Sequence, residues 1–238
     1  ITNSDQFFFS GSSGESYQAT KRNGSDLFLM KINASGSAVE YFTYLGGDGN
    51  ELSFYPDIKL DENEKVYVTT QTCSSDYPTT GNAYSDNSFG CRDSVFTVLD
   101  ILAESANDQL VYSTYISGEV YDITRKLLVT ADHDVILVGG TTSQYFPILS
   151  SAQRTKGVAN EADGFILRFD KGLNYRLSYA SFLGGSLYDS VYAITADPNN
   201  ADGYILTGYT NSSDFPLVGT PLDGELESYD AFITGYTI

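Results

Sequence analysis

The sequence predicts an all-β fold in which one antiparallel sheet recurs about three and a half times. A motif that spans residues 26–47 returns along the chain at intervals of about 69 residues, which is typical of a repeat architecture. Apolar residues come in short runs that are rich in β-branched and aromatic side chains and end at Gly, Asn, Asp or Pro, as strands do. No stretch shows the periodicity of an amphipathic helix.

A threonine-to-proline spacing sets the period. Three threonines stand 69 residues apart, and each is followed six residues later by a proline. The pairs are Thr72 with Pro78, Thr141 with Pro147, and Thr210 with Pro216. Residues 2–8 match the same box except that Phe8 stands in place of the proline. We therefore divide a single partial domain, residues 1–238, into repeats at 1–47, 48–118, 119–185 and 186–238.

Each full repeat is predicted to hold four strands. The first ends in an acidic residue and pairs with the second across a tight polar turn. A long loop then leads to a third strand, which begins at a recurring aspartate, and a tyrosine-rich fourth strand precedes a glycine turn. First strands are expected at 58–61, 129–132 and 194–197, second strands at 66–69, 135–138 and 204–207, third strands at 26–30, 93–96, 163–167 and 230–233, and fourth strands from Tyr41, Tyr112 and Tyr179.

Several of these strands, such as residues 41–45 and 204–206, carry large apolar side chains at successive positions. A strand that is apolar on both faces must be covered on both faces. Four-stranded sheets stacked around an axis meet this need and hide most strand edges, which is the β-propeller solution. In chain order, the four successive sheets are expected to hold two, four, four and three strands. Thirteen strands are too few to close a ring of four-stranded blades. We therefore expect either that the chain is part of a larger propeller or that partner chains complete its blades.

Composition narrows the classes of partner. Thirty-one acidic residues against 13 basic ones give a net charge of −18, which disfavours nucleic acid and anionic membrane surfaces. No apolar run approaches the roughly 18 residues of a membrane-spanning helix, and Ile1 does not begin a signal peptide, so a mature or trimmed chain is expected. With His133 as the only histidine, Ser-His-Asp hydrolysis and zinc sites lack residues. His133 itself is expected to be solvated in a polar turn.

The two cysteines, Cys73 and Cys91, stand at the two ends of a loop between consecutive strands. A bridge between them would clamp this loop and would indicate an oxidising, extracellular or cell-surface location. The alternative is a pair of buried free thiols. Sequons at Asn23, Asn33 and Asn211 fit secretion, although such triplets also arise by chance in a chain rich in Asn and Ser.

Four aspartates recur at the start of the third strand, namely Asp26, Asp93, Asp163 and Asp230. A catalytic residue would occur once, so we expect these carboxylates to accept backbone N–H groups of the preceding turn. No cofactor is indicated except Ca²⁺, for which Asp197, Asn199 and Asp202 supply oxygen ligands in one loop. That spacing is not an EF-hand, and the same residues suit an ordinary hairpin turn.

The repeat resembles that of the SBBP family, a beta-propeller repeat found mainly in secreted and surface proteins of bacteria. The resemblance lies in the Asp-x-Phe strand at Asp26, the Tyr-x-x-Tyr-Leu-Gly-Gly run from Tyr41, the aliphatic strand that ends at Asp197, and the box from Thr210 to Pro216. The middle copies depart from it at Ser117 and at Tyr145, which weakens individual turns. The resemblance implies a propeller scaffold and brings no catalytic residues.

The sequence as a whole favours an extracellular, non-enzymatic structural or adhesive module. The variable loops 74–90 and 147–162 would present a surface to a protein or glycan partner. Two alternatives stand beside it: a secreted polysaccharide hydrolase with paired carboxylates in the propeller channel, and a building block of a surface filament. Other copies of the chain, or the rest of a longer chain, are further expected partners.

Overall fold

A computed structural model of the chain describes residues 16–158, 161–216 and 229–238. The first copy of the threonine-to-proline box, residues 2–8, lies outside the described residues. Within them the chain forms thirteen strands, grouped into sheets of two, four, four and three as predicted. The sheets are β1 (Leu27–Ile32) and β2 (Val39–Leu45); β3 (Glu51–Leu60), β4 (Lys65–Thr72), β5 (Asp93–Asp100) and β6 (Leu110–Ile116); β7 (Asp122–Val129), β8 (Val135–Thr141), β9 (Asp163–Asp170) and β10 (Arg176–Leu183); and β11 (Asp189–Ala196), β12 (Gly203–Thr210) and β13 (Asp230–Thr237).

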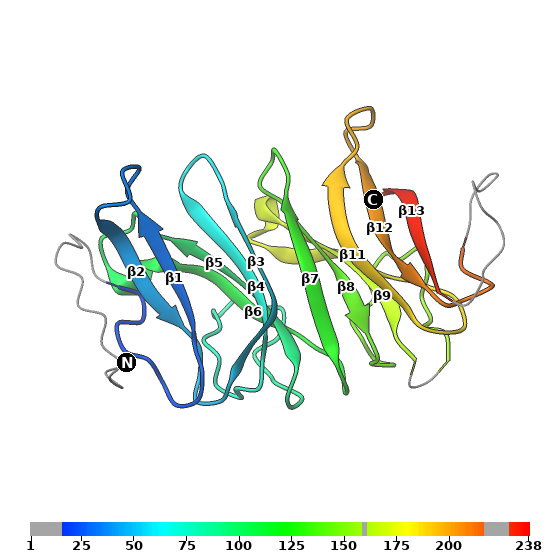
Figure 1. The fold of residues 1–238 in the computed structure, drawn as a ribbon, viewed down its shortest axis with the longest axis horizontal. Helices are drawn as coiled ribbons and strands as arrows, with labels where there is room; N and C mark the ends of the chain where they lie inside the picture. The colour runs from blue at the N-terminus through cyan, green and yellow to red at the C-terminus, as the bar shows by residue number, and fades with distance from the viewer. Residues whose placement is uncertain (1–15, 159–160, 217–228) are drawn as a thin grey trace.

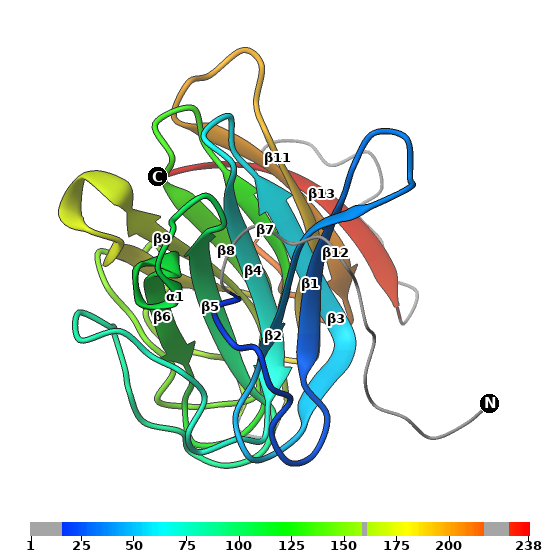
Figure 2. The same cartoon turned by 90° about the vertical axis from the view of Figure 1, so that its left-hand side faces the viewer.

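Each sheet is an antiparallel meander whose strands follow chain order. The four sheets lie side by side in a row, with the first and last sheets at opposite ends (Figure 1). They do not close into a ring within the described residues. Turned by 90°, the sheets are seen one behind another, each twisted relative to the next (Figure 2). The contact between consecutive sheets includes their first strands, β3 against β7 and β7 against β11.

The first strands differ from the prediction. They begin at Glu51, Asp122 and Asp189, well before the expected positions, and the segment expected at 129–132 is the end of β7 and the turn after it. Each first strand also contains a register shift against its neighbour, within Leu52/Asp57, Thr124/Lys126 and Val191/Ala193. Such bulges break the period-2 alternation that reveals a strand in sequence.

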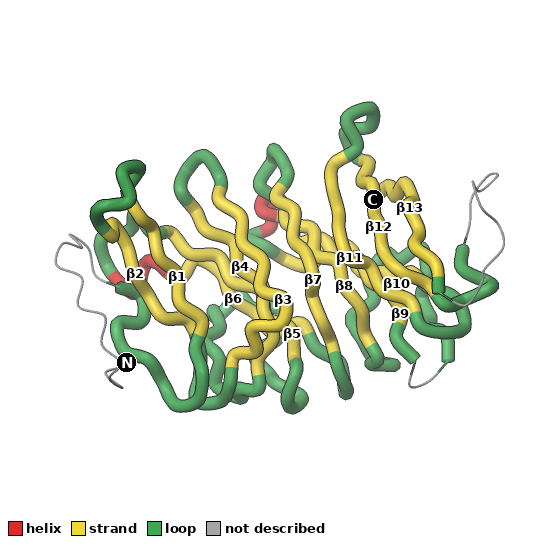
Figure 3. The backbone as a smooth tube through the Cα atoms, in the orientation of Figure 1, coloured by secondary structure: helices red, strands yellow, loops and turns green. Residues whose placement is uncertain are grey.

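Helix is minor in the described part of the chain. It consists of the single turn α1 (Ala106–Gln109) and the 3-10 turn η1 (Lys171–Leu173), neither of which could span a bilayer. The short hairpin turns that join first and second strands project from one side of the row, whereas the loops that join second and third strands lie on the other (Figure 3).

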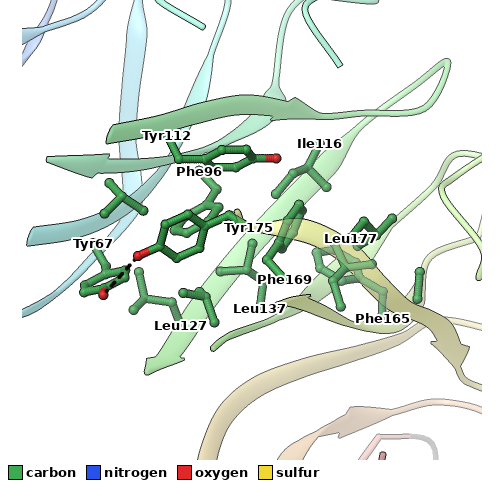
Figure 4. Packing of buried hydrophobic residues seen from close by; sticks show 14 of the residues in the cluster. Tyr67, Phe96, Tyr112, Ile116, Leu127, Leu137, Phe165, Phe169, Tyr175 and Leu177 are labelled. Carbon is green, nitrogen blue, oxygen red and sulfur yellow. Dashed lines mark hydrogen bonds between the residues drawn. The ribbon is translucent and has the colours of Figure 1, made fainter. Parts of the chain in front are cut away.

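The main core lies between the second and third sheets (Figure 4). Phe96 of β5 packs against Phe169 of β9 with ring centroids 5.4 Å apart, and Tyr112 lies 5.4 Å from Tyr175. The hydroxyl groups of Tyr67 and Tyr175 meet at 3.3 Å inside this cluster, so both polar ends are satisfied without water. The strands of the second and third sheets are therefore apolar on both faces, because each of these two sheets packs against a neighbour on both sides.

Cys73 and Cys91 form a disulfide, as expected. Cys73 directly follows the end of β4, and Cys91 stands two residues before β5 begins. The two cysteines are 18 residues apart in the sequence, and the bond joins the two ends of the long loop 74–90 to each other beside the ends of β4 and β5. The bond stabilises the folded chain because it lowers the conformational entropy of the unfolded chain.

We expect the double substitution of Cys73 and Cys91 by serine to lower the free energy of unfolding by about 3 kcal/mol, the loop-closure value for a bridge of this span. Urea denaturation of the variant and of the parent chain, with and without reductant, measures the loss. Reductant should affect only the parent. A variant as stable as the oxidised parent would show that the loop is held by its other contacts alone.

Candidate functional site

The two loops singled out in the sequence lie beside each other on the surface. Loop 74–90 runs along the edge strand β6, where Thr80 N donates to Ser113 O at 3.0 Å and Tyr115 N donates to Ser85 O at 3.0 Å. Loop 147–162, of which residues 159–160 lie outside the described part, pairs with edge strand β10 through the bridge between Leu149 and Ala180. Each loop thus covers the free edge of its own sheet.

A groove of about 450 Å³ opens between these loops. Its apolar floor is made by Tyr112, Leu177 and neighbouring aliphatic side chains, and its rim carries the exposed side chains of Tyr84 and Arg176. The complete lining is Asn82, Ala83, Tyr84, Tyr112, Ile148, Leu149, Arg176 and Leu177. The volume lies in the range of small-ligand sites, and no carboxylate lines the groove.

Hydrogen bonds hold the groove in shape. The Tyr112 hydroxyl accepts the backbone N–H of Tyr84 at 3.1 Å, which fixes the aromatic residue of the rim over the strand below. Asn82 Nδ2 donates to Asn174 O at 3.1 Å, which joins the loop of the second sheet to the turn before β10. The groove is therefore built by two repeats together and is largely formed before any ligand arrives.

The recurring aspartates make the bonds to preceding backbone that their repetition suggested. Asp93 Oδ2 accepts from Phe89 N at 2.8 Å, Asp26 Oδ2 from Arg22 N at 2.9 Å, and Asp163 Oδ2 from Gly157 N at 3.0 Å. Asp230 begins β13, and the segment before Tyr229 lies outside the described residues. The carboxylates of Asp26, Asp93 and Asp163 thus organise turns; Asp93 and Asp163 are fully buried, and Asp26 is half-buried.

A second carboxylate in each repeat was missed by the sequence reasoning. Glu51, Asp122 and Asp189 begin the first strands, and all three are buried. They accept hydrogen bonds from the threonine and serine of the box; Ser74 Oγ donates to Glu51 at 2.7 Å and Ser212 Oγ to Asp189 at 2.8 Å. The sequence does carry a signal for them: an acidic residue follows four positions after each of Gly47, Gly118 and Gly185.

The recurring aspartate of one repeat meets the first-strand carboxylate of the next repeat beside the glycine turn between them. A Cβ at Gly184 would lie 2.8 Å from Asp189 Oδ2 and 2.9 Å from Asp163 Cγ, so both groups border one small space. Asp163 Oδ1 and Asp189 Oδ1 have no hydrogen-bond partner among the described residues, and the same holds for Asp26 Oδ1 and Glu51 Oε2. Two buried carboxylates this close cannot both ionise without a cost in free energy.

Burial is the largest cause that raises the pKa of Asp122 and of Asp163 to about 6 in each case, and the neighbouring carboxylate of the pair contributes in the same direction. Burial likewise raises the pKa of Glu51 and of Asp189. A raised pKa means that the folded protein holds a proton at a pH where the unfolded chain has lost it. The paired carboxyl groups therefore couple the stability of the repeats to pH.

The third sheet lacks the aspartate that the other boxes carry, and its turn is not weakened as expected. In the second sheet Asp76 accepts the backbone N–H of Asp48 at 2.8 Å. Tyr145 stands at the position of Asp76, and the carboxylate comes instead from the opposite partner, Glu119, which accepts from Gln144 N at 2.6 Å and Tyr145 N at 3.0 Å. In both sheets the glycine turn is bonded to the box. The box supplies the carboxylate in the second sheet, and the glycine turn supplies it in the third.

Arg125 links three sheets at the bulges of their first strands. Its guanidinium carbon lies 4.4 Å from the ring centroid of Tyr55 on β3 and 3.9 Å from that of Tyr192 on β11. Arg125 Nε also donates to Ser190 Oγ at 3.1 Å, and the side chain is buried. Cation–π attraction to the two tyrosine rings stabilises the buried guanidinium charge, so Arg125 connects the third sheet to the second and fourth sheets.

His133 is only partly solvated, with 24 % of its side chain exposed, whereas the sequence predicts a solvated side chain. Its Nδ1 lies 3.2 Å from Asp61 Oδ2 and its Nε2 3.2 Å from Glu62 Oε1, so the imidazole spans the β7–β8 turn and the β3–β4 turn. Asp61 also accepts from the hydroxyl of Tyr67 at 3.0 Å. The turns of consecutive sheets lie side by side, which local sequence does not reveal. His133 links two repeats rather than serving as a base beside a serine.

The loop proposed for Ca²⁺ is a compact turn. Asp197 Oδ1 accepts from Asn199 N at 2.9 Å, and Asn200 Oδ1 from Asp202 N at 3.2 Å, as in Asx turns. No group of three or more acidic, cysteine or histidine side chains gathers in the described residues in a way that could hold a metal ion. Calcium binding at Asp197, Asn199 and Asp202 stays a prediction.

The three sequons differ in their surroundings. Asn23 is exposed in the loop before β1, whereas Asn33 Oδ1 accepts from Ser37 N at 2.9 Å within the β1–β2 turn. Asn211 is half-buried after β12. Asn23 is the most exposed of the three asparagines, so it is the sequon best placed for modification.

Comparisons with known proteins do not assign the chain. No family model matches it, and no curated protein matches it.

Proposed function

We propose that the chain is an extracellular, non-enzymatic structural and adhesive module, a segment of a β-propeller with SBBP-like repeats, which binds a glycan in the groove between loops 74–90 and 147–162. The observation that carries the binding function is the groove itself. It is lined by the two loops that do not recur in the repeat, and it combines aromatic and aliphatic walls with one guanidinium.

The arrangement of the sheets supports the propeller. Four meanders follow one another in chain order, each packed on the next, and their first strands meet along one line of contacts from β3 through β7 to β11. In a propeller the first strand of each blade is the innermost. The Cys73–Cys91 disulfide supports an oxidising compartment outside the cytoplasm.

The lining of the groove favours an acidic glycan. Sugar rings stack on aromatic faces such as that of Tyr84, and an amide such as that of Asn82 bonds their hydroxyls. Arg176 adds a guanidinium on the rim, which pairs with a carboxylate. In a protein of net charge −18, a local basic residue beside an aromatic one is a specific feature rather than part of a basic surface.

Hydrolysis receives no support from the paired carboxylates. A glycosidase needs two carboxyl groups on either side of a bound sugar. The pairs at Asp93 with Asp122 and Asp163 with Asp189 are fully buried and so cannot touch a polysaccharide. The groove that a sugar could enter is lined by no Asp or Glu.

We expect the chain to bind polygalacturonate and not dextran in calorimetric titrations, and Arg176→Ala to weaken binding tenfold or more, because a charge-assisted hydrogen bond contributes about 1.5–3 kcal/mol. Tyr84→Ala should weaken it by a similar factor. Tyr145→Ala removes a tyrosine that is 84 % exposed outside the groove and is the matched control. Equal binding by all variants would refute the groove, and reducing ends released from the same polysaccharide would support the hydrolase instead.

A further inference from the structure

The two ends of the row of sheets expose positions that are buried everywhere else in the repeat. Phe28 stands two residues after Asp26 and is 64 % exposed, whereas Val95 and Phe165, two residues after Asp93 and Asp163, are 1 % and 0 % exposed. At the opposite end Ile233 is 79 % exposed, whereas its repeat equivalent Ile166 is fully buried. Exposed large apolar residues at interface positions indicate a surface that is made to be covered.

The direction in which each position faces is the same in every sheet. Side chains two, four and six residues after the recurring aspartate face the preceding sheet: Phe165 and Phe169 of β9 pack in one cluster with Phe96 of β5. Side chains three residues after it face the following sheet, since Ile166 of β9 packs in one cluster with Phe232 of β13. Three internal interfaces obey this rule.

By this rule, within the residues that the structure describes, the first sheet has no preceding neighbour and the last sheet has no following one. We define the leading face as Phe28, Met30 and Ile32 on β1, which are 64 %, 36 % and 48 % exposed. We define the trailing face as Ile233 on β13 with Ile205 on β12; these occupy the repeat positions of Ile166 and Ile136, both fully buried against the last sheet. The two faces are therefore the two halves of one interface type.

We propose that the trailing face of one copy of this chain packs on the leading face of a second copy, head to tail, in the geometry that already joins consecutive sheets within the chain. The contact is heterologous, so repeated association closes into a ring or extends as a filament according to the rotation between copies. The inference rests on the repeat geometry and not on the ligand groove.

The experiment is sedimentation velocity on the full 238-residue chain from 1 to 100 μM in 0.15 and 0.5 M NaCl. We expect concentration-dependent association that high salt preserves, because the contact is apolar and salt screens the repulsion between two chains of net charge −18. Phe28→Glu and Ile233→Glu should each weaken association at least tenfold, with unchanged circular dichroism because both side chains are exposed. Leu173→Glu, at a 55 % exposed position on η1, is the control and should associate like the parent.

Mixing the two variants distinguishes a head-to-tail contact from any symmetric one. Phe28→Glu keeps an intact trailing face and Ile233→Glu an intact leading face, so an equimolar mixture should form a one-to-one dimer and stop there. A parent chain that stays monomeric at 100 μM overturns the proposal. So does a mixture that fails to form the dimer, or an Ile233→Glu variant that associates like the parent.

Discussion

Lowering the pH from 7.5 to 4.5 is expected to raise the free energy of unfolding by about 4 kcal/mol, about 2 kcal/mol for each of Asp122 and Asp163. Most acidic proteins lose stability over this range, because salt-bridged carboxylates become protonated. The opposite trend is expected here because the carboxyl groups concerned are buried in pairs. Urea denaturation at 0.5 pH intervals measures it.

The sign follows from the direction of the pKa shift. Asp122 and Asp163 titrate near pH 6 in the folded chain, against an ordinary value of 3.8. Between these two values the folded protein binds more protons than the unfolded chain, so stability rises as pH falls through this window and is lost as pH rises through about 6. Groups with lowered pKa, such as Asp214, act only below their ordinary value and so oppose this trend little above pH 4.5.

Asp163→Asn isolates the effect. An amide at this position can still accept the N–H of Gly157 with its oxygen, and it carries no negative charge beside Asp189. The variant should be at least as stable as the parent at pH 7.5 and should gain about 2 kcal/mol less on acidification. Asp214→Asn is the control, since Asp214 is exposed and the Ser186 N–H lowers its pKa. An unchanged pH profile for Asp163→Asn would contradict a raised pKa at Asp163.

The carboxylate pairs show where sequence reasoning stops. The recurrence of Asp93 and Asp163 was visible, and so was their role in the preceding turn. Their partners Asp122 and Asp189 come from the next repeat, at the start of bulged strands whose boundaries the alternation pattern hides. Repetition reveals what each repeat contains, whereas contacts between repeats depend on the register of sheets that are packed together.

The same distinction applies to the candidate site. Loops 74–90 and 147–162 were predicted to contact a partner because they do not recur, whereas the recurring residues pack the sheets together. The groove itself needs Asn82 to reach Asn174, a pair separated by 92 residues, and its walls come from two sheets. No spacing in the sequence reports that contact. The contacts of His133 could not be predicted for the same reason, since its partners Asp61 and Glu62 lie in the preceding repeat.

Phe165→Ala is expected to lower the free energy of unfolding by about 3–5 kcal/mol, the usual cost of emptying a buried phenylalanine site. Phe165 is fully buried, and its ring lies 4.7 Å from that of Phe146 and against the backbone at Gly139, where a Cβ would come within 2.9 Å of its Cζ. Because glycine offers no side chain to fill the space, the site cannot collapse around alanine. Urea denaturation at 2 μM chain measures the loss.

Phe28→Ala is the matched control, because Phe28 occupies the same repeat position as Phe165 but has no sheet in front of it within the described part of the chain. At 64 % exposed, its removal should cost less than about 1 kcal/mol in the isolated chain. The difference between the two variants measures what one neighbouring sheet contributes at this position. If both substitutions cost the same, stability comes from within each sheet, and the packing of sheet on sheet is not what holds the repeats together.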